Sequence, residues 1–193
     1  MVVDLTKLST EQLVAAEEAQ LKLLVPHDYR AFLRFVKVSK VAEFGGVGGG
    51  AVTLDPRWKH QLILDEALLR HRRLLLPKSK KIGITTRISQ YLLHAVGYHE
   101  EEKVLIYSKG EREAALVIAM VEYTRQRLPS DIRPVIEGTG SSERLHVPKH
   151  NAEILSLPST STAGVGYTAS KLVMDEADFH ERFQENYDTA ANP

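Results

Sequence analysis

The residues best suited to do chemistry begin with a polar loop of nine residues, Lys78-Ser79-Lys80-Lys81-Ile82-Gly83-Ile84-Thr85-Thr86. A loop that binds phosphate needs exposed backbone N–H groups, a cation, a hydroxyl for Mg²⁺ and a helix N-terminus behind it. Here Gly83 allows close backbone approach, Lys80 and Lys81 supply charge, and Thr85 or Thr86 opens a helix. The loop is therefore a candidate phosphate-binding loop.

This loop departs from the common phosphate-loop pattern, G-x-x-x-x-G-K-[ST], at two positions. Lys78 stands where the first glycine is expected, and Ile84 stands where the lysine is expected. Taken alone, the segment is better interpreted as a solvated basic turn.

The second chemical segment is Leu172-Val173-Met174-Asp175-Glu176, an apolar run that ends in two carboxylates. Sheets of the α/β class bind ligands at the carboxyl ends of their strands. One carboxylate there can hold Mg²⁺, and the other can orient or deprotonate a water aimed at a γ-phosphate. The competing interpretation is an ordinary polar strand end.

A third segment, residues 56–61, contains Trp58 and Gln61. A glutamine amide can pair with both the donor and the acceptor on the adenine edge, and an aromatic ring can stack nearby. The competing interpretation is a helix start with a core tryptophan.

Several periodic segments are placed to position these groups. A capping box at Ser9 and Gln12 starts the first predicted helix, and the tail over 178–193 is partly helical. Helices are predicted at 9–24, 29–38, 58–71, 87–97 and 111–127, strands at 74–76, 103–107 and 171–174, a β-ribbon at 133–157, and a glycine-rich loop or hairpin tip at 45–50. This alternation predicts an α/β domain around a largely parallel sheet.

Composition narrows the class of protein. With 43% hydrophobic residues the chain can bury a core, and 25 basic against 25 acidic residues exclude a uniformly basic nucleic-acid coat. The basic run Arg70–Arg73 is best interpreted as a solvated helix end.

The sequence has no cysteine, which excludes disulfides, thiolate metal sites and cysteine nucleophiles. No apolar run is long enough for a membrane span, and the first residues do not resemble a signal peptide. We therefore expect an intracellular protein.

Taken together, the segments from Pro56 to His180 resemble the ATPase domain of phage and prophage large terminase subunits, the motors that package DNA into capsids. That family often carries a deviant phosphate loop, K-[SA]-R-Q-x-G-x-[ST]-[TW]. The loop at 78–86 is similar to it nearly position for position, with Lys80 for the arginine and Lys81 for the glutamine. Residues 166–170 match the family segment G-Y-T-[AG]-S, and residues 172–180 are similar to its acidic motif, h-h-h-D-E-x-A-F.

The resemblance implies a P-loop NTPase-like three-layer α/β fold with a largely parallel central sheet, flanking helices and a β-ribbon. Residues 1–54 would form a helical and glycine-rich segment packed on an ATPase core at 55–193. The implied cofactors are ATP and Mg²⁺. The implied partners are double-stranded DNA, the portal and the small terminase subunit, with a homo-oligomeric ring in the assembled motor. The implied location is the host cytoplasm.

The resemblance also assigns roles to residues. Thr85 and Asp175 would hold Mg²⁺, and Glu176 would position the attacking water. Lys80, with Lys81, would neutralise phosphate charge, and Gln61 would read adenine. The residues expected to surround the phosphates are Lys78, Ser79, Lys80, Lys81, Ile82, Gly83, Ile84, Thr85 and Thr86.

The chain departs from the family in two ways. Val165 stands where an arginine often precedes Gly-Tyr-Thr, which puts hydrolysis in doubt if that arginine stabilises charge. The resemblance also stops before a coupling segment and a nuclease domain. We therefore expect a truncated gene product or an expressed fragment that turns ATP over slowly or not at all.

Three alternatives stay open. Residues 175–178 spell Asp-Glu-Ala-Asp, the motif of a helicase-like ATPase, but the Gly-Lys-Thr and Ser-Ala-Thr segments of such enzymes are absent from the sequence. A non-hydrolysing nucleotide-fold assembly module is best supported by Ile84. A structural α/β domain without a ligand is the third.

Overall fold

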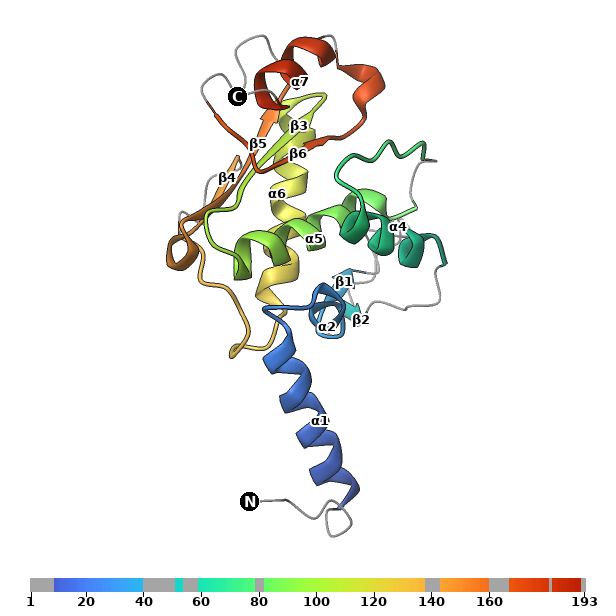
Figure 1. Ribbon diagram of the computed structural model, residues 1–193, viewed down its shortest axis with the longest axis vertical. Coiled ribbons are helices and arrows are strands. Elements are labelled where there is room, and N and C mark those ends of the chain that lie inside the picture. The colour runs from blue at the N-terminus through green and yellow to red at the C-terminus, as the bar shows by residue number, and fades with distance from the viewer. Residues whose placement is uncertain are drawn as a thin grey trace.

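The computed structural model describes residues 9–39, 51–53, 59–78, 82–137, 143–159, 167–180 and 182–191. Its centre is a four-stranded mixed sheet with strand order β4-β5-β3-β6 (Figure 1). The central strand β3 (Lys103–Ser108) runs parallel to β5 (Ala152–Pro158) and to β6 (Lys171–Met174). The strand β4 (Arg144–Val147) joins β5 as an antiparallel hairpin through a short 3₁₀ turn at Pro148–His150. The predicted largely parallel pairing is thus present. The ribbon predicted at 133–157 is present from Arg144 onward, whereas residues 133–136 form no strand and Glu137 makes an isolated bridge to His146.

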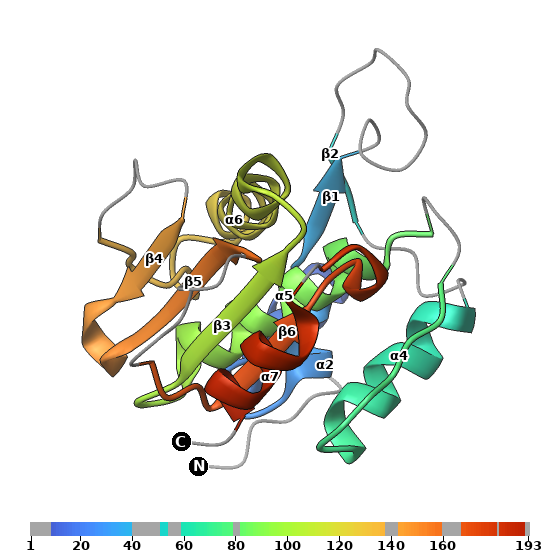
Figure 2. The same ribbon diagram turned by 90° about the horizontal axis from the view of Figure 1, so that it is seen from above.

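Both faces of the sheet are covered, as the alternation of side chains along β3 requires. Val104 and Ile106 belong to the main core, which includes residues of α5 (Ile84–Tyr98) and α6 (Glu111–Gln126). Leu105 and Tyr107 belong to a second cluster with Ala190 of α7 (Phe183–Ala191). Figure 2 shows α6 and α7 on opposite sides of the strands. This arrangement is an α/β fold and is compatible with three layers.

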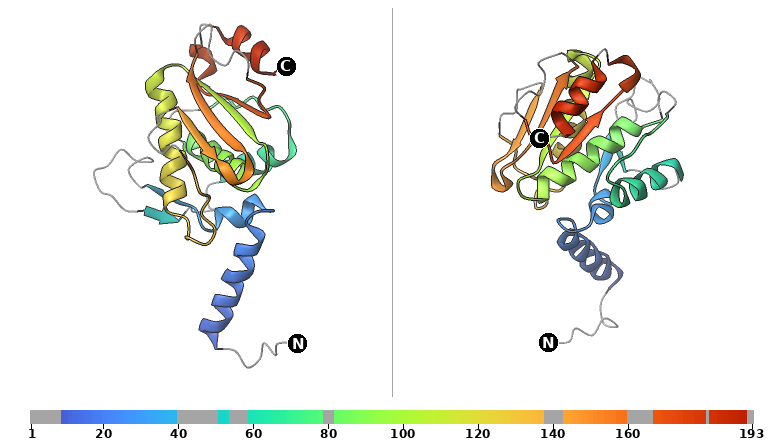
Figure 3. Two further views of the ribbon diagram at one scale, coloured as in Figure 1. Left: turned by 90° about the vertical axis from the view of Figure 1, so that its left-hand side faces the viewer. Right: turned by 45° about the horizontal axis from the view of Figure 1, so that its top comes forward.

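The N-terminal residues extend this core and then leave it. The helix α1 (Thr10–Leu24) begins at the predicted capping box, in which Ser9 and Gln12 each bond the other's backbone N–H. None of its residues is buried, and it projects away from the sheet (Figure 3). The short helix α2 (Tyr29–Leu33) instead buries Tyr29 and Phe32 against the main core. Residues 9–39 therefore contribute to the core mainly through α2.

The predicted helix at 29–38 is wrong after Leu33. The chain turns at Arg34 and Phe35 and enters β1 (Lys37–Ser39), which pairs antiparallel with β2 (Ala51–Thr53). Val38 is a β-branched residue, a type that favours a strand once a partner strand is present. The glycine-rich segment at 45–50 lies outside the described residues.

The predicted buried strand at 74–76 is also wrong. Residues 73–78 have no regular structure, and Leu75 is 89% exposed. Three residues followed by Pro77, which has no N–H to donate, are a weak strand unless a neighbouring strand captures them. Within the described ranges, no strand pairs with the outer edge of β6.

The remaining helices follow the periodicity closely. The helix α4 (Lys59–Arg70) falls within the predicted 58–71. The helix α5 begins three residues before the predicted start at Arg87, because Gly83 provides its N-cap. A 3₁₀ turn at Ala177–Phe179 follows β6. No helix in the described part of the chain has both the length and the apolar character that crossing a bilayer demands.

Candidate functional site

The first component of the site is the amino end of α5. Gly83 is the N-cap residue, with φ 75° and ψ 12°, a left-handed conformation that glycine adopts without a Cβ clash. Its carbonyl accepts the N–H of Arg87 at 3.0 Å, and no side chain of the described residues caps the helix. The N–H groups of the first turn are therefore available for an anion, and the helix dipole favours negative charge there.

The second component is Asp175, which directly follows β6. Its N–H donates to the carbonyl of Tyr107 at 2.9 Å and so extends the β3–β6 pairing by one residue. Its carboxylate accepts a hydrogen bond from Thr85 Oγ1 at 2.9 Å and another from Lys78 Nζ at 2.7 Å. The backbone N–H of Glu176 donates to the same carboxylate at 3.0 Å. Asp175 is thereby fixed against the start of α5.

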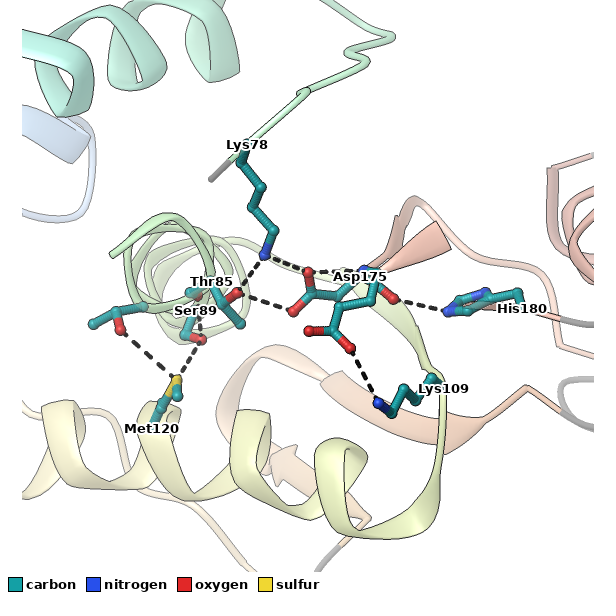
Figure 4. A network of polar contacts seen from close by, with 9 residues as sticks. Lys78, Thr85, Ser89, Lys109, Met120, Asp175 and His180 are labelled. Atoms are coloured by element: carbon teal, nitrogen blue, oxygen red, sulfur yellow. Dashed lines mark hydrogen bonds and ion pairs between the residues drawn. The ribbon is translucent and has the colours of Figure 1, made fainter. Parts of the chain in front are cut away.

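Lys78 completes this cluster, because its Nζ also donates to Thr85 Oγ1 at 3.0 Å. Figure 4 shows Lys78 reaching down from the irregular segment to meet Thr85 and Asp175. Asp175 is 90 residues from Thr85 and 97 residues from Lys78 in the sequence. The structure thus brings together the predicted phosphate loop and the predicted acidic strand end, the two segments on which the sequence interpretation depends.

The Thr85 hydroxyl and the Asp175 carboxylate fit the ligand preference of Mg²⁺ for hard oxygen atoms. Both already point at one cation, the ammonium group of Lys78. No cluster of three or more histidine, cysteine, aspartate or glutamate side chains suited to a metal occurs in the described residues. Mg²⁺ at nucleotide sites usually takes few protein ligands and completes its octahedron with water and phosphate oxygens, so two protein oxygens are sufficient.

Glu176 lies beside Asp175 but has a different environment. Its backbone is left-handed, with φ 54°, and its side chain is 39% exposed. Lys109, which follows β3, places its Nζ 3.9 Å from Glu176 Oε2 and stacks over the Phe179 ring at 5.1 Å from the centroid. Glu176 is therefore an exposed carboxylate near the cluster, oriented toward a second cation.

Other side chains hold the cluster in place. His180 is buried, and its Nε2 donates to the carbonyl of Asp175 at 2.8 Å. The Ser89 hydroxyl donates to the carbonyl of Thr85 at 2.8 Å, one turn along α5. The Thr86 hydroxyl instead faces α6, where it contacts Met120 Sδ at 3.8 Å. Thr85, which the family resemblance implies as the magnesium ligand, is the threonine directed at the strand end.

The helix α4 packs against the same end of α5. His60 Nε2 donates to the carbonyl of Ile82 at 3.0 Å. Asp65 accepts two hydrogen bonds from the Arg87 guanidinium, at 2.6 Å to Nε and 2.5 Å to Nη2. Both side chains are buried, with 7% and 5% exposure. This ion pair joins the two helices directly behind the loop, and no motif in the sequence marks it.

The remaining predicted site residues have mixed placements. Ile84 is buried, so the residue at the usual lysine position packs inward. Gln61 is 3% exposed, and its Oε1 has no hydrogen-bond partner in the described structure. Its predicted role in reading adenine stays a prediction. The residues singled out in the sequence that lie outside the described ranges are Trp58, Ser79, Lys80, Lys81, Val165 and Gly166.

A second polar cluster lies at the opposite end of the sheet, around a cavity of about 260 Å³. Burial lowers the pKa of His94 to about 4 and also lowers the pKa of His99. Burial alone would raise the pKa of Glu102, but hydrogen bonds from Lys171 and Ser170 outweigh it and lower that pKa. These groups lie near the starts of β3 and β6, so they are separate from the cluster at Asp175.

Comparison with known proteins adds no assignment. No protein-family model matches the chain, and no curated protein matches it in sequence.

Proposed function

We propose that this chain is the ATPase domain of a DNA-packaging motor of the large-terminase type, which binds ATP with Mg²⁺ and hydrolyses it. One observation carries the proposal. The cation, hydroxyl and carboxylate of Lys78, Thr85 and Asp175 meet within hydrogen-bonding distance at the amino end of α5, although they come from two distant segments. Such a grouping beside a free helix N-terminus suits a phosphate group with a divalent cation.

Each residue has a definite task in this proposal. The N–H groups after Gly83 bind the phosphate oxygens, and Gly83 lets the backbone approach them closely. Thr85 and Asp175 hold Mg²⁺, which when bound offsets the negative charge of the phosphates. The exposed carboxylate of Glu176 orients the attacking water and accepts its proton. Lys80 and Lys81 add positive charge near the phosphates.

The motor part of the proposal rests on the resemblance of the motifs. Packaging of double-stranded DNA, docking to a portal and a small subunit, assembly into a ring and a place in the host cytoplasm are all proposed on that basis. An isolated domain lacking a charge-stabilising arginine from elsewhere would turn over slowly, because such an arginine contributes on the order of 10³-fold or more.

Calorimetric titration of ATP in the presence and absence of Mg²⁺ tests the proposal. We expect Mg²⁺-dependent binding that is lost in Thr85→Ala and kept in Glu176→Ala, with any phosphate release lost in Glu176→Ala. Thr124→Ala is the matched control, because its hydroxyl donates to the Met120 carbonyl within α6 at 3.0 Å and takes no part in the hydrogen bonds that join Lys78, Thr85 and Asp175. Absence of binding in the unaltered chain, or equal loss in Thr124→Ala, would contradict the proposal.

A second candidate, a non-hydrolysing nucleotide-binding module, is favoured by a specific observation. The segment before the loop is an exposed coil rather than a strand, and the buried Ile84 replaces the usual lysine. The loop therefore lacks two features that position phosphates in active enzymes. Nucleotide binding without phosphate release, unchanged by added DNA, would favour this candidate.

A further inference from the structure

The ammonium group of Lys78 lies at the position that the proposed function assigns to a metal ion. Its Nζ is 3.0 Å from Thr85 Oγ1 and 2.7 Å from Asp175 Oδ1, and Thr85 donates to the other oxygen of Asp175 at 2.9 Å. The three groups form a closed triangle, seen face-on in Figure 4. Lys78 therefore contacts both of the proposed metal ligands at once.

A lysine and a divalent cation cannot both bind this pair of oxygens closely, because they would occupy the same space and repel each other. The side chains of Lys78 and Asp175 are 27% and 18% exposed, so the carboxylate is partly withdrawn from water and needs a positive partner. In the chain alone, the ammonium supplies that charge.

We propose that Lys78 is an exchangeable cation: it holds Thr85 and Asp175 together in the free chain, and it transfers to phosphate oxygens when a magnesium nucleotide binds. This inference rests on the proposed function and identifies which lysine of the loop binds the phosphates of an incoming nucleotide. It makes Lys78, rather than Lys80 or Lys81, the residue that couples metal binding to phosphate binding.

The surroundings of Lys78 permit such a movement. Lys78 lies in the irregular segment at 73–78, in which Leu75 is 89% exposed and no regular hydrogen-bond ladder holds the backbone. A lysine side chain is a flexible stem with a compact charge, so its ammonium can change partners by rotating side-chain bonds. Lys109, the other described cation at this strand end, is 3.9 Å from Glu176 and serves a different carboxylate.

The exchange predicts opposite effects of one substitution on two ligands. Without the ammonium of Lys78, a metal ion alone meets Thr85 and Asp175 free of a competitor, so it should bind more tightly. A magnesium nucleotide loses one charge-assisted contact to phosphate, so it should bind more weakly. A lysine with a purely structural role would not shift the two affinities in opposite directions.

The test uses the full chain and Mn²⁺ as the metal probe, followed by electron paramagnetic resonance without nucleotide, beside calorimetry of ATP with Mg²⁺. In Lys78→Met we expect Mn²⁺ affinity to rise about tenfold and magnesium–ATP affinity to fall about tenfold, each equal to about 1.4 kcal/mol. Lys78→Arg keeps the cation and should restore Mn²⁺ affinity to nearly that of the unaltered chain.

Lys171→Met is the matched control. Lys171 begins β6, at the opposite end of the strand from Asp175, its side chain is 26% exposed, and it is ion-paired with Glu102 at 2.5 Å. It therefore removes the same charge at nearly the same exposure without touching the cluster, and both affinities should stay unchanged. Thermal unfolding of each variant checks that the fold is retained.

The outcomes separate this inference from the proposed function. Magnesium–ATP binding in the unaltered chain, with no gain of Mn²⁺ affinity in Lys78→Met, overturns the exchange and leaves the proposed function standing. If Mn²⁺ affinity rises in Lys78→Met but neither the unaltered chain nor any variant binds ATP, Lys78 is supported as the competitor at the cation position. The nucleotide-binding function is then refuted. A similar gain in Lys171→Met would also overturn the exchange, since general charge would then explain it.

Discussion

The ion pair between Asp65 and Arg87 should be one of the strongest single links in the fold. The two side chains are 7% and 5% exposed, and the guanidinium donates two hydrogen bonds to the carboxylate, at 2.6 and 2.5 Å. Replacing only one partner leaves the other charge buried and unpaired, which costs about 3–5 kcal/mol. We therefore expect Arg87→Met alone and Asp65→Leu alone each to lower the free energy of unfolding by about that amount.

The double variant should lose much less than the sum of the two single losses, because no buried charge is left behind. Urea unfolding of the unaltered chain, the two single variants and the double variant measures this coupling directly. The Arg144 and Glu153 pair on neighbouring strands supplies the matched control: the Arg144 side chain is 55% exposed, so losing that pair should cost under about 1 kcal/mol. Additive losses at Asp65 and Arg87, or a loss under about 1 kcal/mol for Arg87→Met, would refute this reasoning.

Two further predictions concern the core around α5. Burial lowers the pKa of His94 to about 4 from a usual value near 6.5, so the unfolded chain binds more protons between these values. The free energy of unfolding should then be largely retained above about pH 6.5 and fall by about 1 kcal/mol between about pH 6.5 and pH 5.5. Urea unfolding of the unaltered chain and of His94→Gln measures this fall, and an equal slope in both would contradict the assignment. Gly97→Ala should lower the free energy of unfolding by about 1–3 kcal/mol, because an added Cβ would lie 2.6 Å from Cγ of Pro134. A midpoint of thermal unfolding equal to that of the unaltered chain would show that Pro134 can move away without cost.

The elements that the sequence predicts well are those whose signals are local. The apolar run at 103–107 becomes the buried centre of the sheet, because a strand covered on both faces needs apolar residues at every position. The capping box at Ser9 and Gln12 starts α1 as expected, since both of its hydrogen bonds lie within four residues. The signal of each feature lies within its own segment, so both can be inferred without knowledge of a distant partner.

The elements that the sequence predicts badly are those that a distant partner decides. Residues 37–39 form a strand because residues 51–53 pair with them, and a helix-like spacing of apolar residues cannot reveal that partner. The leucine run at 74–76 has the composition of a buried strand but no neighbour among the described residues, and it stays exposed. In both cases tertiary pairing outweighs the local preference.

The candidate site shows the same division. The sequence indicates the types of residue and the two segments. The loop pattern alone leaves Thr85 and Thr86 open, and only the family resemblance assigns the magnesium ligand to Thr85. The structure distinguishes them, since Thr85 faces Asp175 and Thr86 faces Met120. The bond between Lys78 and Asp175 spans 97 residues and has no signature in either segment.

The pairing register of β6 decides which of its two terminal carboxylates serves the cluster. Met174 lies opposite Tyr107 of β3, and the N–H of Asp175 donates to the Tyr107 carbonyl, which fixes the height of Asp175 beside the start of α5. Successive residues of a strand point to opposite faces, so a slip of one residue would place Glu176 or Met174, instead of Asp175, beside the start of α5. The left-handed backbone of Glu176, with φ 54°, then turns the chain away immediately, so the second carboxylate faces Lys109 instead of Thr85. The two carboxylates therefore have different surroundings because of the register of β6 and the turn at Glu176. The register and the turn both depend on the β3–β6 pairing.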